Sequence, residues 1–166
     1  MVSCWISVGS NLRREASIAG GLRELRQRFG TLRLSPIYET QAIGTTGPPF
    51  FNLVVGIQTQ LTVSALNAIL NAIEDAQGRE RSEDKFAPRT LDLDLLTYGQ
   101  MIGPIEGYQV PREDILDYAF VLAPLAAVAP EECHPQLGLS YATLWQAFDL
   151  DARGQPAPVL VSVALD

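Results

Sequence analysis

Two hydrophobic patterns alternate along the first 98 residues, and their order restricts the chain to few architectures. Short apolar runs rich in Val, Ile and Phe predict strands, whereas apolar residues three or four positions apart predict helices. The predicted elements are strand Val2–Val8, helix Arg14–Phe29, strands Leu32–Thr40 and Phe50–Thr59, helix Val63–Gly78 and strand Thr90–Tyr98. The order β-α-β-β-α-β predicts a ferredoxin-like α+β fold, in which helices cover one side of an antiparallel sheet.

The remaining residues predict additions to this core. Asp114–Val128 has a helical pattern, and Pro124 is expected to kink or divide that helix. Ser140–Phe148 predicts a short amphipathic helix, and Val159–Leu165 predicts an edge strand. Because 166 residues are enough to bury one core, we expect residues 1–166 to form a single domain.

Composition excludes several classes of function. The formal net charge of −7 argues against nucleic acid as a partner and disfavours an RNA-binding module, because phosphate neutralisation needs a basic surface. Cys4 and Cys133 lack metal-ligand spacing, and each is expected to be a small buried side chain. Without a secretion signal or a long apolar run, the sequence predicts a cytoplasmic monomer that binds small molecules and no membrane.

Asp92 and Asp94 lie two residues apart in the otherwise apolar run LDLDLL. Alternate side chains of a strand face the same side, so both carboxylates would project together while Leu91, Leu93 and Leu95 point into a core. A solvated strand face and a metal site both remain open from these two residues alone. We favour metal binding, because aspartate is a poor strand former and needs a reason to occur twice on one face.

A charged stretch precedes the two aspartates, with RERSEDKF at Arg79–Phe86 and Arg89 close behind. In isolation this composition is typical of a solvated mobile loop. Beside the aspartates, its cations can neutralise a triphosphate whose magnesium the carboxylates hold. Phosphoryl transfer depends mostly on positioning and charge stabilisation, so such a site needs no dedicated nucleophile.

Other polar residues allow two explanations each. Phe50 and Asn52 share one strand face and could read a flat heterocycle, or they are a core Phe and a turn-facing Asn. Glu74 is by default an exposed helical residue. His134 is the only histidine, is expected in an exposed loop and offers no partner for a histidine-based site. Gly9–Asn11 predicts a structural turn, because it lacks a phosphate-loop pattern.

Five segments carry a more specific pattern. They are VGSNL at Val8–Leu12, SPIYET at Ser35–Thr40, PFFN at Pro49–Asn52, GRERSEDKFAPRTLDLDLL at Gly78–Leu96 and FVLAPLAAVAP at Phe120–Pro130. In order and spacing, these segments resemble 6-hydroxymethyl-7,8-dihydropterin pyrophosphokinase of folate biosynthesis over about the first 130 residues. The resemblance implies a ferredoxin-like enzyme that moves pyrophosphate from ATP to the pterin hydroxymethyl group and leaves AMP, with two Mg²⁺ ions.

The resemblance also implies residue roles. The residues implied for catalysis are Arg79, Arg89, Asp92 and Asp94, of which Asp92 and Asp94 would bind the metal. Those implied for the nucleotide are Arg81, Phe86, Arg89 and Arg112, and those implied for the pterin are Thr40, Ile43, Gly44, Phe50, Asn52 and Phe120. Phe50 and Phe120 would sandwich the ring. Asn52 would read its amide edge, and Glu74 matches the acidic residue that ends the family's second helix.

Departures from the family pattern gather on the nucleotide side. Arg112 stands where the family has His, and Tyr118 stands where an arginine usually precedes the Phe. Gln41 and Ala42 replace the usual proline after Thr40. Tyr118 removes a cation, and one lost charge-assisted contact costs about 2 to 4 kcal/mol of transition-state stabilisation. These changes motivate an alternative, a pterin-binding homologue with weak or lost transfer.

Overall fold

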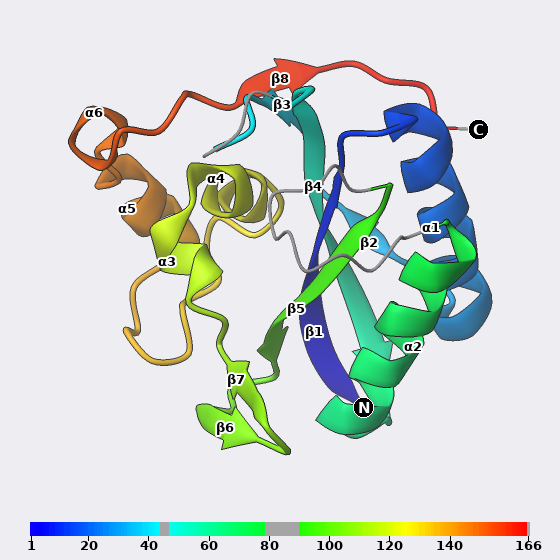
Figure 1. Ribbon diagram of the computed structural model, residues 1–166. Helices are drawn as coiled ribbons and strands as arrows, with labels where there is room; N and C mark the ends of the chain where they lie inside the picture. The colour runs from blue at the N-terminus through cyan, green and yellow to red at the C-terminus, as the bar shows by residue number, and fades with distance from the viewer. Residues whose placement is uncertain (44–46, 79–89, 166) are drawn as a thin grey trace.

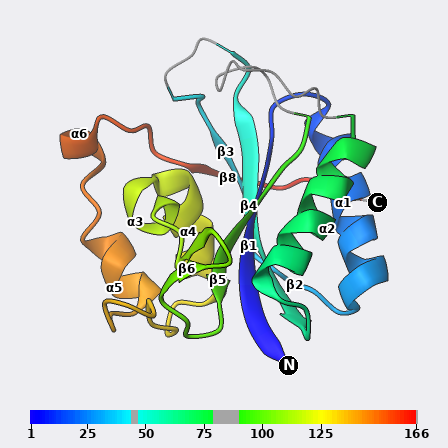
Figure 2. The ribbon, with the colours of Figure 1, turned by 60° about the horizontal axis from the view of Figure 1, so that its bottom comes forward.

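The computed structural model describes residues 1–43, 47–78 and 90–165 and has an antiparallel sheet with helices on both faces (Figures 1 and 2). The strands are β1 (Val2–Ser10), β2 (Arg33–Leu34), β3 (Ile37–Thr40), β4 (Phe50–Thr59), β5 (Asp92–Tyr98), β6 (Gly103–Ile105), β7 (Tyr108–Val110) and β8 (Val159–Val161). The helices are α1 (Arg14–Phe29), α2 (Val63–Ala76), α3 (Asp114–Asp117), α4 (Ala119–Val128), α5 (Tyr141–Gln146) and α6 (Leu150–Arg153).

The sheet order is β5-β1-β4-β3-β8, with β2 also paired to β4, while β6 and β7 form a separate two-stranded sheet. The four strands β5-β1-β4-β3, joined through α1 and α2, confirm the predicted ferredoxin-like α+β fold. Thr62 caps α2 as its side chain accepts the Ala65 N–H at 3.2 Å. Among the described residues, no helix has both the length and the apolar character needed to cross a membrane.

The sheet separates two hydrophobic cores. On one face, Ile6 and Leu93 pack with residues of α1 and α2 such as Leu22 and Leu66. On the other face, Trp5 and other residues of the sheet pack against α3, α4 and α5. The expectation that helices cover one side therefore holds for α1 and α2 only, because the C-terminal helices bury the second face as well.

The predicted helix at Asp114–Val128 is divided, but not where the sequence suggested. α3 ends at Asp117, Tyr118 has extended backbone angles of φ −126° and ψ 126°, and α4 continues through Pro124. The backbone groups on either side of this break form hydrogen bonds with a residue far away in the sequence. The Gln155 side chain accepts the Ala119 N–H at 2.9 Å and donates to the Asp117 carbonyl at 2.6 Å. The helix is thus interrupted where a remote amide satisfies its backbone.

Strand Leu32–Thr40 is likewise two strands, separated at Ser35 and Pro36. Proline has no N–H for the ladder. The Ser35 hydroxyl accepts the Val54 N–H at 2.8 Å, and Ser35 N–H donates to the Val54 carbonyl at 2.9 Å. Ser35 therefore remains hydrogen-bonded to Val54 of β4 although it lies between two strands. Strand β8 is shorter than expected, since it ends at Val161 rather than at residue 165.

The exposures expected for Cys133 and His134 were wrong. Cys133 is exposed, whereas Cys4 is buried as expected, and burial raises the pKa of the Cys4 thiol to about 12. His134 is only 2% exposed instead of lying in an exposed loop. Its Nδ1 accepts the N–H groups of Gln136 and Leu137, both at 3.2 Å. The buried imidazole therefore stabilises this loop by accepting two of its backbone hydrogen bonds.

Protonation of His134 is expected to destabilise the fold. Burial lowers the pKa of His134 below its ordinary 6.5, so the unfolded chain takes up this proton at a higher pH than the folded chain does. The contribution of His134 to stability is therefore complete above about pH 6.5 and declines as the pH falls below it. An NMR titration of the single histidine should give a midpoint below 6.5 in the folded protein. A midpoint at or above 6.5 would contradict the buried, neutral imidazole.

Candidate active site

Strand pairing brings the polar site residues onto one face of the sheet. Gly9 of β1 is opposite Asp92 of β5 and opposite Asn52 of β4, while Ser7 is opposite Asp94. Directly paired residues of neighbouring antiparallel strands project to the same face. Asp92 and Asn52 thus flank Gly9, and the predicted common face of Asp92 and Asp94 is confirmed.

A pocket of about 430 Å³ opens over this part of the sheet. It is lined by Ser7, Gly9, Thr40, Gln41, Ala42, Ile43, Phe50, Asn52, Asp92, Asp94, Asp114, Tyr118, Phe120 and Val121. Every described residue that the sequence proposed for the metal or the pterin lies in this one pocket. The predicted residues Gly44, Arg79, Arg81, Phe86 and Arg89 lie outside the described residues.

Asn52 is held in one orientation at the pocket floor. It is 4% exposed, and its Nδ2 donates to Thr40 Oγ1 at 2.6 Å. Its Oδ1 lies against Gly9, where an added Cβ would come within 2.9 Å of that oxygen. The turn-facing alternative for Asn52 is therefore wrong. The pair of Asn52 and Thr40 presents fixed polar groups that suit the edge of a heterocycle.

Replacing Gly9 by Ala is expected to displace Asn52, because the new methyl group would occupy the space beside Oδ1. The amide can rotate away, so the cost should appear in ligand binding more than in folding. We expect the KM for a ligand of this pocket to rise roughly tenfold, the loss of about one neutral hydrogen bond. Steady-state kinetics would measure it, with Ser3→Ala on the same strand as control. An unchanged KM would contradict the role given to this glycine.

Aromatic residues enter the pocket from both layers. Phe50 comes from strand β4, and Phe120 comes from α4, which covers that face of the sheet. The Phe120 ring stacks on Tyr118, with 4.9 Å between ring centroids and 26° between planes. Tyr118 therefore supplies an aromatic support at the position where the family pattern predicts an arginine.

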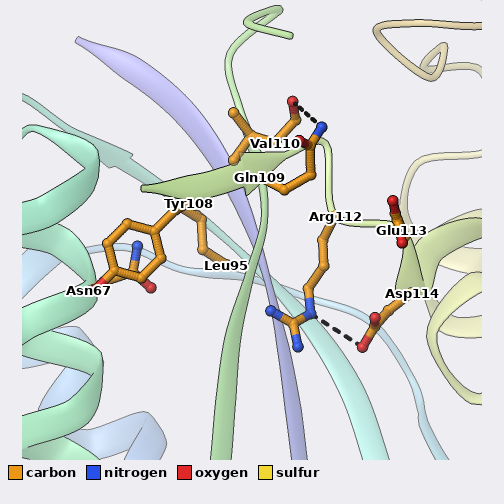
Figure 3. Close-up of a pocket in the computed structure, with 8 residues that line it drawn as sticks. All are labelled: Asn67, Leu95, Tyr108, Gln109, Val110, Arg112, Glu113 and Asp114. Carbon is orange, nitrogen blue, oxygen red and sulfur yellow. Dashed lines mark hydrogen bonds and ion pairs between the residues drawn. The ribbon is translucent and has the colours of Figure 1, made fainter. Parts of the chain in front are cut away.

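Arg112 is the described cation closest to the paired carboxylates. Its Nη2 lies 3.8 Å from Asp94 Oδ1. Its Nε lies 3.1 Å from Asp114 Oδ2, an ion pair that Figure 3 shows. Burial alone would lower the pKa of Arg112, but the charges of Asp94, Asp114 and Asp92 raise it above its ordinary value. Arg112 therefore keeps its positive charge beside the carboxylates of Asp92, Asp94 and Asp114.

Arg112 also lines a second pocket of about 350 Å³ (Figure 3). The remaining lining residues are Asn67, Leu95, Tyr108, Gln109, Val110, Glu113 and Asp114. Asp114 borders both this pocket and the larger one. Asp114 was not among the predicted site residues, and its position two residues after Arg112 was the only signal that could have indicated it.

The carboxylates of Asp92 and Asp94 suit a metal ion that binds together with a phosphate ligand. Asp92 and Asp94 face the larger pocket, and the Asp94 side chain keeps 31% of its surface exposed. Magnesium commonly uses one or two carboxylates and completes its shell with water and substrate phosphates. Within the described residues, no group of three or more His, Cys, Asp or Glu could hold a metal by itself. Two carboxylates therefore fit magnesium as part of a substrate complex.

Glu74 supports the strand that carries these carboxylates. It is 2% exposed, which corrects the default expectation of an exposed helical residue. Its Oε2 accepts the Leu93 N–H at 2.8 Å, between the two aspartates in sequence. A carboxyl oxygen accepts such a bond from a backbone N–H that would otherwise be unsatisfied in the interior. Glu74 thereby fastens β5 to α2 at the site.

The comparison with known families agrees with this arrangement. A family model of 7,8-dihydro-6-hydroxymethylpterin-pyrophosphokinase (HPPK) matches residues 5–130. The chain belongs to the HPPK family. This is a family of enzymes, and the pyrophosphokinase from Pseudomonas aeruginosa is 35% identical over 76% of this chain and 80% of its own length. The Synechocystis pyrophosphokinase is 36% identical over 87% of this chain and 74% of its own length.

Other HPPK relatives are larger proteins. The folic acid synthesis protein fol1 of Pneumocystis carinii is 34% identical over 86% of this chain, which spans only 20% of that protein. The crystal structure of Plasmodium falciparum HPPK-DHPS matches 87% of this chain and 41% of its own, with a TM-score of 0.67 and 12% identity. At that identity the structural match supports the HPPK fold alone.

Proposed function

We propose that this chain transfers pyrophosphate from ATP to 6-hydroxymethyl-7,8-dihydropterin in the presence of Mg²⁺ and releases AMP. The observation that carries the proposal is the single pocket in which Asp92 and Asp94 lie beside Asn52, Thr40 and an aromatic wall. A flat ring with a polar edge and a phosphate-bound metal both find complementary groups there. We further propose that residues 1–166 work as one pyrophosphokinase-like domain.

Each part of the pocket has its own task in this reaction. Asn52, held by Thr40, binds the polar edge of the pterin, and the Phe50 and Phe120 rings pack against its faces. This contact places the hydroxymethyl group toward the aspartates. Positioning of this kind supplies a large part of the catalysis in phosphoryl transfer.

The charged residues act on the phosphates. Asp92 and Asp94 would hold Mg²⁺, which when bound neutralises phosphate charge and so favours attack on the β-phosphorus. Arg112, which lines the smaller pocket, is proposed to contact the nucleotide phosphates. Arg79, Arg81 and Arg89 are proposed to do so as well, from the family resemblance, and Phe86 to cover the substrates.

The test is formation of AMP and pterin pyrophosphate by the purified protein. The two products should form in equal amounts and require Mg²⁺ and the pterin together, because hydrolysis of ATP would give no pterin pyrophosphate. An Asp92→Asn variant with an unchanged circular dichroism spectrum serves as the inactive control. If the wild-type protein forms no more AMP than this variant, the proposed activity is wrong.

A second candidate function is pterin binding with weak or lost transfer. The ion pair between Arg112 and Asp94 favours it, because a guanidinium beside a metal ligand opposes metal binding. Tyr118 also supplies no positive charge. Calorimetry separates the two functions: a pterin that binds while Mg²⁺-dependent ATP binding is absent supports the second candidate.

A further inference from the structure

The C-terminal segment fastens two walls of the larger pocket. Residues from 131 onward lie beyond the range matched by the family model. In Figure 1 the chain runs from α6, beside α5, across to β8, which lies next to β3. Between α6 and β8 it passes through Gln155, whose side chain bonds to the junction between α3 and α4.

The first attachment fixes the helical wall. Ala119 is the first residue of α4, and the first N–H groups of a helix have no partner within it. Gln155 Oε1 accepts this N–H, and Gln155 Nε2 donates to the Asp117 carbonyl on the other side of the break. Tyr118 lies between these two bonded groups and stacks on Phe120 in the pocket wall. One amide therefore clamps the backbone that presents both rings.

The second attachment fixes the strand wall. β8 pairs with β3 through Ile37 with Val161, Tyr38 with Leu160 and Glu39 with Val159. β3 ends at Thr40, whose hydroxyl accepts the hydrogen bond that orients Asn52. Without β8, β3 would be an edge strand with one row of unpaired backbone groups. β8 thus stiffens the strand that holds the polar end of the pocket.

A stiff spacer joins the two attachments. The residues between Gln155 and Val159 are Pro156, Ala157 and Pro158. Proline restricts its own φ angle and the conformation of the residue before it, so such a spacer is semi-rigid, at about 3 Å per residue. The separation of the two attachments is therefore fixed by the chain itself and not by contacts with a ligand.

We infer that Gln155–Val161 is a strap that sets the distance between the α4 wall and the β3 wall, and that Gln155 is a positioning residue for binding of a flat ring. The identity of the ring rests on the proposed function. Gln155 touches the helix junction rather than the ring, so it acts through Tyr118 and Phe120. Loosening the strap should affect the pocket for the ring more than the smaller pocket, because Gln155 bonds to Asp117 and Ala119, and neither of these lines the smaller pocket.

Two variants loosen the strap in different ways. Gln155→Ala removes both hydrogen bonds, and insertion of two glycines between Ala157 and Pro158 keeps Gln155 but lengthens the spacer. Gln155→Glu retains an acceptor for Ala119 and loses the donor to Asp117. Gln136→Ala, at an exposed glutamine on another loop, is the matched control.

The main readout is the KM for the pterin, compared with kcat and with the KM for ATP. Loss of one or two neutral hydrogen bonds predicts a pterin KM raised roughly 5- to 20-fold in Gln155→Ala. Gln155→Glu should raise the pterin KM less than Gln155→Ala does, and the glycine insertion should raise it by a similar factor. Gln136→Ala should leave the pterin KM unchanged. The KM for ATP and kcat at saturation should stay within about twofold of wild type. An unchanged pterin KM in both loosened variants, or a parallel rise in both KM values, overturns the strap.

Hydrogen exchange tests the strap without any ligand. The Ala119 amide should exchange faster in Gln155→Ala, and the β3 amides should exchange faster in the glycine insertion, with helix α1 unchanged as internal reference. Unchanged exchange at both walls overturns the inference. If the wild-type protein neither binds the pterin nor forms AMP, the proposed function fails, and the exchange result alone decides for or against the strap.

Discussion

Asp94→Asn is expected to reduce pyrophosphate transfer roughly 10³-fold, because the amide keeps the shape of the side chain but removes the charge that holds a metal. Asp94 faces the pocket together with Asp92, and its side chain keeps part of its surface open to solvent. The loss should appear in kcat at saturating pterin, with binding of the pterin itself little changed. The measurement is AMP formation over a range of Mg²⁺ concentrations.

Asp151→Asn is the matched control for this variant. Asp151 is an exposed aspartate on α6, so the same chemical change there should leave kcat within about twofold of wild type. Thermal unfolding would confirm that both variants fold. Full activity of Asp94→Asn at low Mg²⁺ would show that this carboxylate is not a metal ligand, whatever the reaction proves to be.

Arg112→Gln is expected to have two opposite effects. It should lower kcat/KM for ATP by roughly 30-fold or more, because one charge-assisted contact to a phosphate is lost. It should also tighten the binding of a divalent cation to the nucleotide-free protein, because Asp94 and Asp114 lose a positive neighbour. Electron paramagnetic resonance of Mn²⁺ would measure the second effect without any turnover.

Arg33→Gln controls for the loss of an arginine that is paired with a carboxylate. Arg33 lies 3.4 Å from Glu132, far from the site in the sheet, and this exposed pair should contribute little. Neither ATP kinetics nor Mn²⁺ affinity should change in this variant. If Arg112→Gln weakens Mn²⁺ binding instead, then Arg112 does not compete with the metal, and its ion pair with Asp94 supports the acidic group in another way.

The local patterns of the sequence predicted the strands of the sheet and the common face of Asp92 and Asp94, since a two-residue period determines which side chains share a face. The same reasoning placed Phe50 and Asn52 together. It could not reveal that Gly9 lies between Asp92 and Asn52, because strand order and register depend on contacts between distant segments.

Features that depend on hydrogen bonds of the folded chain could not be predicted from the sequence pattern. Helix 114–128 breaks at Tyr118 and not at Pro124, and Gln155 satisfies the broken backbone from 36 residues away. His134 is buried because a local loop folds around its imidazole, which composition alone does not show. Glu74 is buried because a backbone N–H of β5 offers it a partner. In each case a hydrogen bond formed only in the folded chain overrides the residue's usual preference.

Asp114 lines both pockets, so the same carboxylate can contact a ligand in either one. A ligand that moves this carboxylate in one pocket also changes the shape and charge of the other pocket. Thermodynamic linkage then requires the influence to be mutual: each ligand changes the affinity of its neighbour by the same factor. Substitution of this aspartate should therefore alter the cooperativity between the two ligands, even where it leaves the affinity for each ligand alone unchanged.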